Sequence, residues 1–199
     1  MTMRNTLILV PTGLELDHLN RAGGLEHPGC RVALCGFGPV AAAARTAQLL
    51  CRWKPSRVIL VGSAGTYDEG RAPIEVAVAG GRVTIDVGGE GFPQWPGDAD
   101  TPQVGDTLDL SGEGEDLLLT VCTASAGPDQ AGLRHRSHPD AVAEEMEGFG
   151  VALAATLVGV PVCIIRGISN RAGDRNLGEW KIKEALIAAR ARALEILDG

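Results

Sequence analysis

Apolar residues along this chain fall into short, β-branched runs that alternate with longer segments rich in alanine and leucine. Several of the short runs have no alternating polar residues, which is typical of strands that are buried on both faces. These runs predict strands at residues 6–10, 31–35, 57–61, 74–79, 82–86, 117–122 and 160–166.

The longer segments predict helices at residues 39–53, 141–158 and 179–197. Pro39 at the start of the first helix and Gly159 just past the second are residues that commonly begin and end helices. Strands that alternate with helices form a mostly parallel sheet with helices on its faces. The pattern therefore predicts an α/β fold.

Residues 87–114 differ from the rest because they are dense in glycine, proline and aspartate. Such a segment is typical of a loop or lid and not of a core. The chain shows no internal repeat and no linker, and its 199 residues suffice for one domain with a substantial core. We expect a single domain over residues 1–199, with the loop or lid at about 87–114.

Composition restricts the choice of partner. The 18 basic and 25 acidic residues give a net charge of −7, and the basic residues form no cluster. Nucleic acids and anionic membranes are bound mainly through Lys and Arg, so we expect neither as a partner. The five cysteines form no CxxC pair, and the apolar stretch before Pro11 is too short for a signal peptide or a membrane span. These features favour a cytoplasmic location.

Two glycine-rich turns follow predicted strands. Residues 36–41, GFGPVA, fit the dinucleotide fingerprint G-x-G-x-x-A. However, they follow the second strand, and the next strand ends without an acidic residue for a ribose, so a packing turn is favoured over an NAD site. In the turn GSAG, Val61 stands where the nucleophile elbow of a serine hydrolase needs glycine. Its small residues can instead let a flat ligand approach the backbone.

Polar pairs mark two later segments. Glu145 and Glu147 flank Met146, and extended backbone would place both carboxylates on one side. There they could accept hydrogen bonds from two ribose hydroxyls, whereas the alternative is a solvated, acid-rich helix start. Ser169 and Asn170 follow the apolar strand VPVCII, where the alternative is an Asx turn.

Glu15 lies just past the first strand, where an ordinary helix-start carboxylate is the alternative interpretation. Ligands of open α/β sheets bind outside the carboxyl ends of strands. Glu15, the GSAG turn, the glutamate pair and the Ser-Asn pair are therefore expected to line one crevice. The four histidines lack metal-ligand spacing, so we expect no metal and no cofactor.

In the order VGSAG, EMEG and RGISN, the chain resembles the nucleoside phosphorylase and nucleosidase superfamily over most of its length. Within the hydrolytic branch, VPTGLELDHL and IIRGISNRAGDRNLGEWKIKEAL are most similar to the futalosine hydrolases of a route to menaquinone. The resemblance implies a three-layer αβα sandwich with a central mixed, mostly parallel sheet, a small-molecule nucleoside substrate, and a homodimer or higher homo-oligomer. The arginines that hold phosphate in phosphorolytic members have no counterpart here, so water is the expected acceptor.

The resemblance also implies roles for the matching residues. Glu15 would activate water, Glu147 would bind the ribose hydroxyls, and Asn170 would contact the purine at N7. The other substrate-binding positions that it implies are Ser63 near the water, Ala64 and Gly65 beside the base, Glu145 and Met146 along the sugar, and Ser169, which would orient Asn170.

Asn170 departs from the adenine-specific nucleosidases, which have Asp at this position. Its amide can donate to N7 and to the oxygen of a 6-oxopurine, but it faces the 6-amino group of adenine donor to donor. An unpaired buried donor costs about 1–3 kcal/mol, so we expect hypoxanthine to be preferred. Another purine nucleoside (methylthioadenosine, S-adenosylhomocysteine or inosine) and a dinucleotide-binding module remain alternatives. Candidates for the benzoate end of the substrate are Arg134, Arg136 and Arg171, and those for a subunit interface are Trp53, Phe92 and Trp95.

Overall fold

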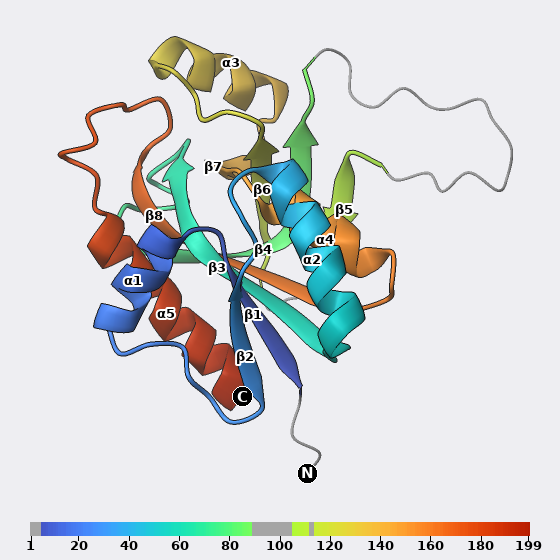
Figure 1. Ribbon diagram of the computed structural model, residues 1–199. Helices are drawn as coiled ribbons and strands as arrows, with labels where there is room; N and C mark the ends of the chain where they lie inside the picture. Colours follow the sequence, from blue (N-terminus) through green and yellow to red (C-terminus); the bar gives the residue numbers. More distant parts are fainter. Residues whose placement is uncertain (1–4, 89–104, 112–113) are drawn as a thin grey trace, which may run out of the picture.

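The computed structural model describes residues 5–88, 105–111 and 114–199. Its strands are β1 (Thr6–Val10), β2 (Cys30–Leu34), β3 (Arg57–Thr66), β4 (Ala77–Asp86), β5 (Thr107–Asp109), β6 (Asp116–Val121), β7 (Ala141–Glu145) and β8 (Val162–Arg171). They form one sheet in the order β2-β1-β3-β7-β6-β4-β5, and β8 pairs with both β3 and β4 (Figure 1).

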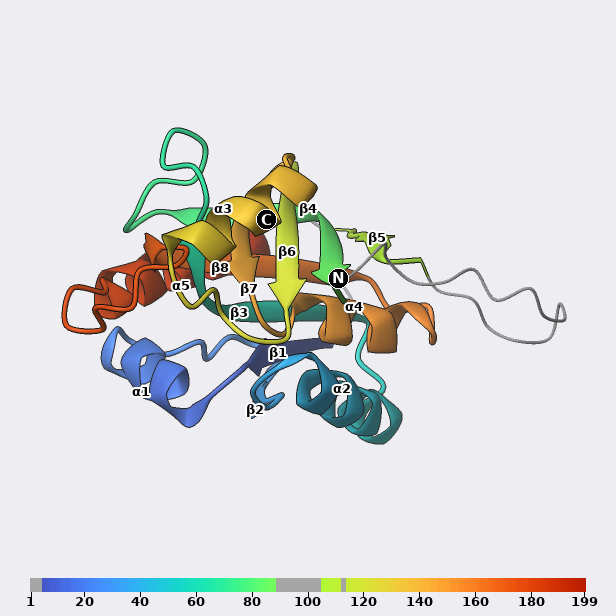
Figure 2. The same ribbon diagram turned by 90° about the horizontal axis from the view of Figure 1, so that it is seen from above.

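The helices are α1 (Gly13–Arg21), α2 (Pro39–Trp53), α3 (Pro128–Ser137), α4 (Gly148–Thr156) and α5 (Ile182–Asp198). Figures 1 and 2 show α1 and α5 together on one side of the sheet, and α2 and α4 together on the other. The predicted three-layer αβα sandwich with a mixed, mostly parallel sheet is thus confirmed. Within the described residues, no helix has both the length and the apolarity needed to cross a membrane.

The core follows from the alternation of side chains along strands whose two faces are both apolar. In β1, Leu7 and Leu9 pack into the cluster that includes α2 and α4, whereas Ile8 and Val10 pack into the cluster that includes α1 and α5. Full burial of such a side chain stabilises the fold by about 1.5–3 kcal/mol. The apolar runs seen in the sequence therefore hold both helical layers to the sheet.

Five of the described strands pair in a closed circuit, in the order β3, β7, β6, β4, β8 and back to β3. The pairing of β3 with β7 is antiparallel and joins Gly65 to Glu144 and Thr66 to Ala143. The two strands thus overlap only near their carboxyl ends. Because the strands are antiparallel and overlap only there, the carboxyl ends of β3 and β7 lie next to each other.

Two predicted elements were wrong. Residues 141–145, expected to be helical, form the buried strand β7, and helix α4 begins only at Gly148. Alanine and glutamate favour helices, but pairing with β6 overrides that local preference. Residues 74–79 and 82–86, expected as two strands, form the single strand β4 from Ala77, with a register shift between Gly80 and Arg82.

Helices α1 and α3 were not predicted, because both are polar and short. Within the expected loop, β5 pairs with β4, and Leu108 packs against the core. The remainder of that loop at 89–104 and 112–113, including Phe92 and Trp95, lies outside the described residues. Trp53 is partly buried against the core, with Arg31 over its ring.

Candidate active site

A cavity of about 340 Å³ lies where β3, β7 and β8 end and α1 begins. All nine residues proposed from the sequence line it, although they come from four separate segments of the chain. They are Glu15, Ser63, Ala64, Gly65, Glu145, Met146, Glu147, Ser169 and Asn170.

Glu15 is held in the first turn of α1, where Thr12 caps the helix. Its Oε1 atom accepts hydrogen bonds from the Ser63 amide (2.9 Å) and the Ser63 hydroxyl (3.0 Å), and its Oε2 atom accepts one from the Thr12 hydroxyl (2.8 Å). A carboxylate has about four acceptor positions, so capacity for a water molecule remains. Gly62, which precedes Ser63 in β3, leaves room for Arg166, because a Cβ atom at this position would clash with Arg166 Nη1.

Glu147 caps the start of α4 and is buried. Its Oε1 atom accepts a hydrogen bond from the Gly38 amide (2.9 Å), and its Oε2 atom lies 3.2 Å from Arg166 Nη2. Gly38 belongs to the turn at residues 36–41 that fits the dinucleotide fingerprint. Its amide is occupied by a side chain of the protein itself, in agreement with the packing interpretation. Burial raises the pKa of Glu147 to about 7, against the lowering effect of Arg166.

Glu145 has its carboxylate fully engaged. The hydroxyl of Thr120 and the guanidinium of Arg166 donate to it, as do the amides of Glu147 (2.9 Å) and Gly148 (2.7 Å). Glu145 therefore joins the buried cation to the start of α4. Arg166 itself has no exposed surface, and no described residue accepts a hydrogen bond from its Nε and Nη1 atoms.

Arg166 is a residue of the site that the sequence reasoning missed. The signal was present, because a cation that directly follows the apolar run at residues 162–165 can be buried only with anionic partners. Those partners are 19 and 21 positions away and could not be identified from spacing alone.

Asn170 is oriented by its neighbours. The Ser169 hydroxyl donates to Asn170 Oδ1 (2.6 Å), and Asn170 Nδ2 donates to the backbone oxygen of Arg171 (2.7 Å). One of the two amide hydrogens is therefore left for a ligand. The register between β3 and β8 shifts between Ala64 and Gly65, which makes Ser169 an extra residue in its strand. Such a bulge re-aims side chains, and it explains how two consecutive strand residues both line the cavity.

A further polar network at the cavity was not predicted. Glu144 accepts hydrogen bonds from the Tyr67 hydroxyl (2.8 Å), the Ser125 amide (2.8 Å) and the Ser125 hydroxyl (2.6 Å). Burial, together with the charge of Glu144, raises the pKa of Tyr67. Arg134 donates to Ser125 Oγ (2.8 Å) and pairs with Asp86 (3.1 Å). Arg134 is thus already committed within the protein.

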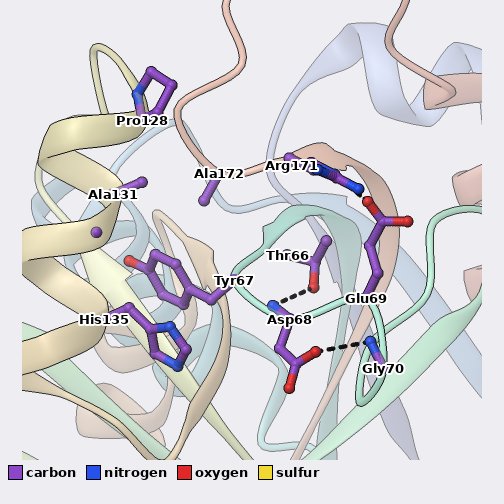
Figure 3. A pocket seen from close by; sticks show the side chains of 11 residues that line it. Thr66, Tyr67, Asp68, Glu69, Gly70, Pro128, Ala131, His135, Arg171 and Ala172 are labelled. Carbon is purple, nitrogen blue, oxygen red and sulfur yellow. Dashed lines mark hydrogen bonds and ion pairs between the residues drawn. The ribbon is translucent and has the colours of Figure 1, made fainter.

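A second pocket of about 480 Å³ is lined by residues at the ends of β3 and β8 and on α3 (Figure 3). Arg171 lines it and pairs with Glu69, and the ring of Tyr67 stacks on His135 at 5.1 Å. None of the nine proposed residues lines this second pocket. Arg134, Arg136 and Arg171, the candidates for the benzoate end, are all missing from the described residues that line the first cavity.

The sequence model of the phosphorylase superfamily matches residues 117–199. The futalosine hydrolase of Streptomyces coelicolor is 33% identical over 176 residues, which cover 80% of this chain and 75% of that protein. The futalosine hydrolase of Thermus thermophilus is 30% identical, with 96% of this chain and 94% of that protein covered. The 5′-methylthioadenosine/S-adenosylhomocysteine nucleosidase of Listeria welshimeri is 34% identical, with 70% of this chain and 67% of that protein covered.

Solved structures show the same fold. The futalosine hydrolase of Helicobacter pylori superposes with a TM-score of 0.78 at 17% identity, covering 98% of this chain and 97% of that chain. A 5′-methylthioadenosine/S-adenosylhomocysteine nucleosidase of Colwellia psychrerythraea, in complex with adenine, gives a TM-score of 0.80 at 21% identity, covering 99% and 96%. Together with the sequence relatives, these similarities show that the chain belongs to the phosphorylase superfamily, in the group that contains the futalosine hydrolases.

Proposed function

We propose that this chain hydrolyses the N-glycosidic bond of futalosine, releasing hypoxanthine and dehypoxanthine futalosine in a route to menaquinone. The observation that carries the proposal is the Asn170 amide, held by Ser169 through its oxygen so that an N–H remains for the base. The sequence relatives named futalosine hydrolase support the same substrate.

In the proposed reaction, Glu15 takes a proton from water as the water oxygen attacks the anomeric carbon. The C–N bond breaks with its electron pair moving to the purine, and the sugar passes through an oxocarbenium-like state. The hydroxyls of Thr12 and Ser63 orient Glu15 for this step. Glu147 binds the ribose hydroxyls and, as an anion, favours positive charge on the sugar.

Base preference follows from the amide of Asn170. Its one remaining N–H can be shared between N7 and the neighbouring oxygen of a 6-oxopurine, which are both acceptors. Adenine instead presents the N–H donors of its 6-amino group at the second position. Since an amide is not an acid, the leaving purine is stabilised as an anion by hydrogen bonding and takes its proton from solvent. Hypoxanthine, a 6-oxopurine with an unsubstituted N7, meets both conditions.

The charge of the cavity supports water over phosphate as the acceptor. It is lined by five acidic residues and, among its described lining residues, by one cation, Arg175. The acidic residues are Glu15, Glu144, Glu145, Glu147 and Asp174. The buried Arg166 is already paired with two of these carboxylates. An oxyanion such as phosphate would therefore meet acceptors where it needs donors.

The test is to incubate the protein with futalosine, inosine and methylthioadenosine, with and without phosphate, and to follow the free base by chromatography. We expect hypoxanthine from futalosine at a rate that does not depend on phosphate. Adenine release, or a requirement for phosphate, would overturn the substrate assignment. If none of the three substrates is cleaved and the protein binds NAD, the dinucleotide-binding alternative would be favoured.

Three further parts of the proposal rest on the sequence. Cysteine usage and the short apolar stretch before Pro11 favour the cytoplasm, and the length favours one domain. The family resemblance implies a homodimer or larger homo-oligomer. Light scattering measures the oligomer directly, and a monomer at working concentration would contradict it.

A further inference from the structure

The floor and the mouth of the cavity differ in chemistry. The floor is polar and buried, with Glu15 exposed to 8% and Ser169 to 2%. The mouth carries Leu14, Phe37 and Leu177, which are exposed to 67%, 66% and 65%. These three side chains come from α1, from the turn before α2 and from the segment after β8. Apolar groups that gather from separate segments around one opening are typical of a binding surface.

Arg175 lies at this mouth beside Trp180. Its guanidinium carbon is 5.5 Å from the centroid of the indole ring, a distance that gives cation–π attraction. The indole is fixed in turn, because its Nε1 atom donates to the backbone oxygen of Asp174 (3.2 Å). Within the described parts of the chain, the ion pairs do not include Arg175. An oriented cation is thus available for an anionic ligand.

The charges also decide where an anionic part of a substrate can lie. Five acidic residues line the cavity. Four of them are the glutamates named above, and the fifth is Asp174, whose Oδ1 atom already accepts a hydrogen bond from the Asn176 amide (2.9 Å). A carboxylate on the ligand is therefore repelled from the glutamates of the floor, and Arg175 is the one cation among the described lining residues that attracts it. With the purine at Asn170 and the ribose at Glu147, the 5′ substituent has the open mouth as its exit. The mouth offers apolar side chains for a ring and a guanidinium for a carboxylate.

We propose that Leu14, Phe37, Leu177, Trp180 and Arg175 form a subsite for an aromatic carboxylate on the 5′ side of the nucleoside. The ring packs against the apolar side chains, and the carboxylate accepts hydrogen bonds from Arg175. This inference rests on the proposed function, since it assigns the benzoate end of futalosine to this subsite.

The test compares the effect of removing the Arg175 charge with the effect of removing the carboxylate or the aromatic group from the substrate. Arg175→Gln and the wild type are assayed with futalosine, with its carboxamide analogue, and with inosine, which has the same base and ribose but no aromatic substituent. We expect KM for futalosine to rise about fivefold to twentyfold in the variant, a size suited to an exposed but charge-assisted pair, with kcat within about twofold. The carboxamide and inosine should be unaffected. Arg31→Gln is the matched control, because Arg31 also lies 5.5 Å from the centroid of a tryptophan ring, that of Trp53, and does not line the cavity.

Two results would overturn the subsite while leaving the proposed function intact: futalosine cleavage unchanged in Arg175→Gln, or an equal loss on all three substrates. If the wild type cleaves inosine or methylthioadenosine but not futalosine, the proposed function fails. In that case the subsite is tested by inhibition of the observed reaction with benzene-1,3-dicarboxylate. Inhibition that Arg175→Gln abolishes would retain the subsite, and absence of inhibition would reject it.

Discussion

The cavity contains two groups of carboxylates that are held in different ways. Among the described residues, Glu15 accepts hydrogen bonds from neutral groups, namely the hydroxyl of Thr12 and the hydroxyl and amide of Ser63. Glu145 and Glu147 instead share the buried cation Arg166. Neutral donors orient a carboxylate and leave it able to take a proton. A buried cation compensates charge and fixes position. The first arrangement suits chemistry, and the second suits binding and stability.

The largest effect on activity is expected for Glu15→Gln, which keeps the shape of the side chain but removes the base. General base catalysis contributes about 10²–10⁴-fold, so we expect kcat to fall by about a thousandfold. Substrate affinity and thermal stability should change little, because the amide oxygen still accepts from Ser63. The rate of hypoxanthine release measures kcat, and calorimetric titration with substrate measures the affinity. Asp17→Asn, an exposed acid on the same helix, serves as control. Near-normal kcat in Glu15→Gln would remove Glu15 from the mechanism.

Arg166→Met should have the opposite profile, with a large loss of stability. It leaves Glu145 and Glu147 buried without their cation, which typically costs about 3–5 kcal/mol. Thermal unfolding should shift down by about 6–20 °C for a chain of this size. The triple variant Glu145→Gln, Glu147→Gln, Arg166→Met separates charge from packing, since it removes the unpaired charges together with the cation. Recovery of part of the lost stability is expected, and an equally unstable triple variant would assign the loss to packing.

Asn170→Asp tests recognition of the base, to which neither group of carboxylates contributes. An aspartic acid can donate to N7 and accept from a 6-amino group, so the ratio of adenine to hypoxanthine nucleoside cleavage should rise about tenfold to a hundredfold. The measurement is kcat/KM for methylthioadenosine against futalosine. Asn176→Asp, an exposed residue on the segment after β8, is the control. An unchanged ratio in Asn170→Asp would show that this amide does not select the base.

Elements and site residues could be predicted from the sequence where neighbouring residues determine the structure, and not where distant strands determine it. Strand β1 (Thr6–Val10) follows from its own apolar run, and Glu145 and Glu147 were identified as a pair by their spacing. The helix predicted for residues 141–145 was wrong, because β7 forms there through pairing with β6 and not through local preference. Sequence reasoning weighed an extended backbone at the glutamate pair and a helix over the same residues, and only tertiary pairing could decide between them.

The contacts that hold the site were beyond reach for the same reason. The Gly38 amide binds Glu147 across 109 positions, and the Ser63 hydroxyl binds Glu15 across 48. Arg175 lies in the C-terminal segment that resembles the futalosine hydrolases, but no pattern in the sequence indicated that its side chain lines the cavity. Residue types at strand ends predicted which side chains meet, while their partners required the fold.

The smallest expected effect concerns Glu147, whose pKa is raised by burial to about 7 from an ordinary value of 4.5. Between these pH values the folded protein binds more protons than the unfolded chain, so the free energy of unfolding should fall as pH rises from about 4.5 to about 7 and level off above. We expect a decrease of the order of 1 kcal/mol, because coupling to Glu145 and Arg166 spreads the titration over several groups. Urea unfolding at pH 5, 6, 7 and 8 measures it, and Glu147→Gln should flatten the curve over this window. Substrate affinity should change in the opposite direction, since ribose binding needs the carboxylate, so KM falls as pH rises through 7. A wild-type stability that increases through the window, and does so only while Glu147 is present, would show that the pairing with Arg166 outweighs burial and that Glu147 is ionised throughout.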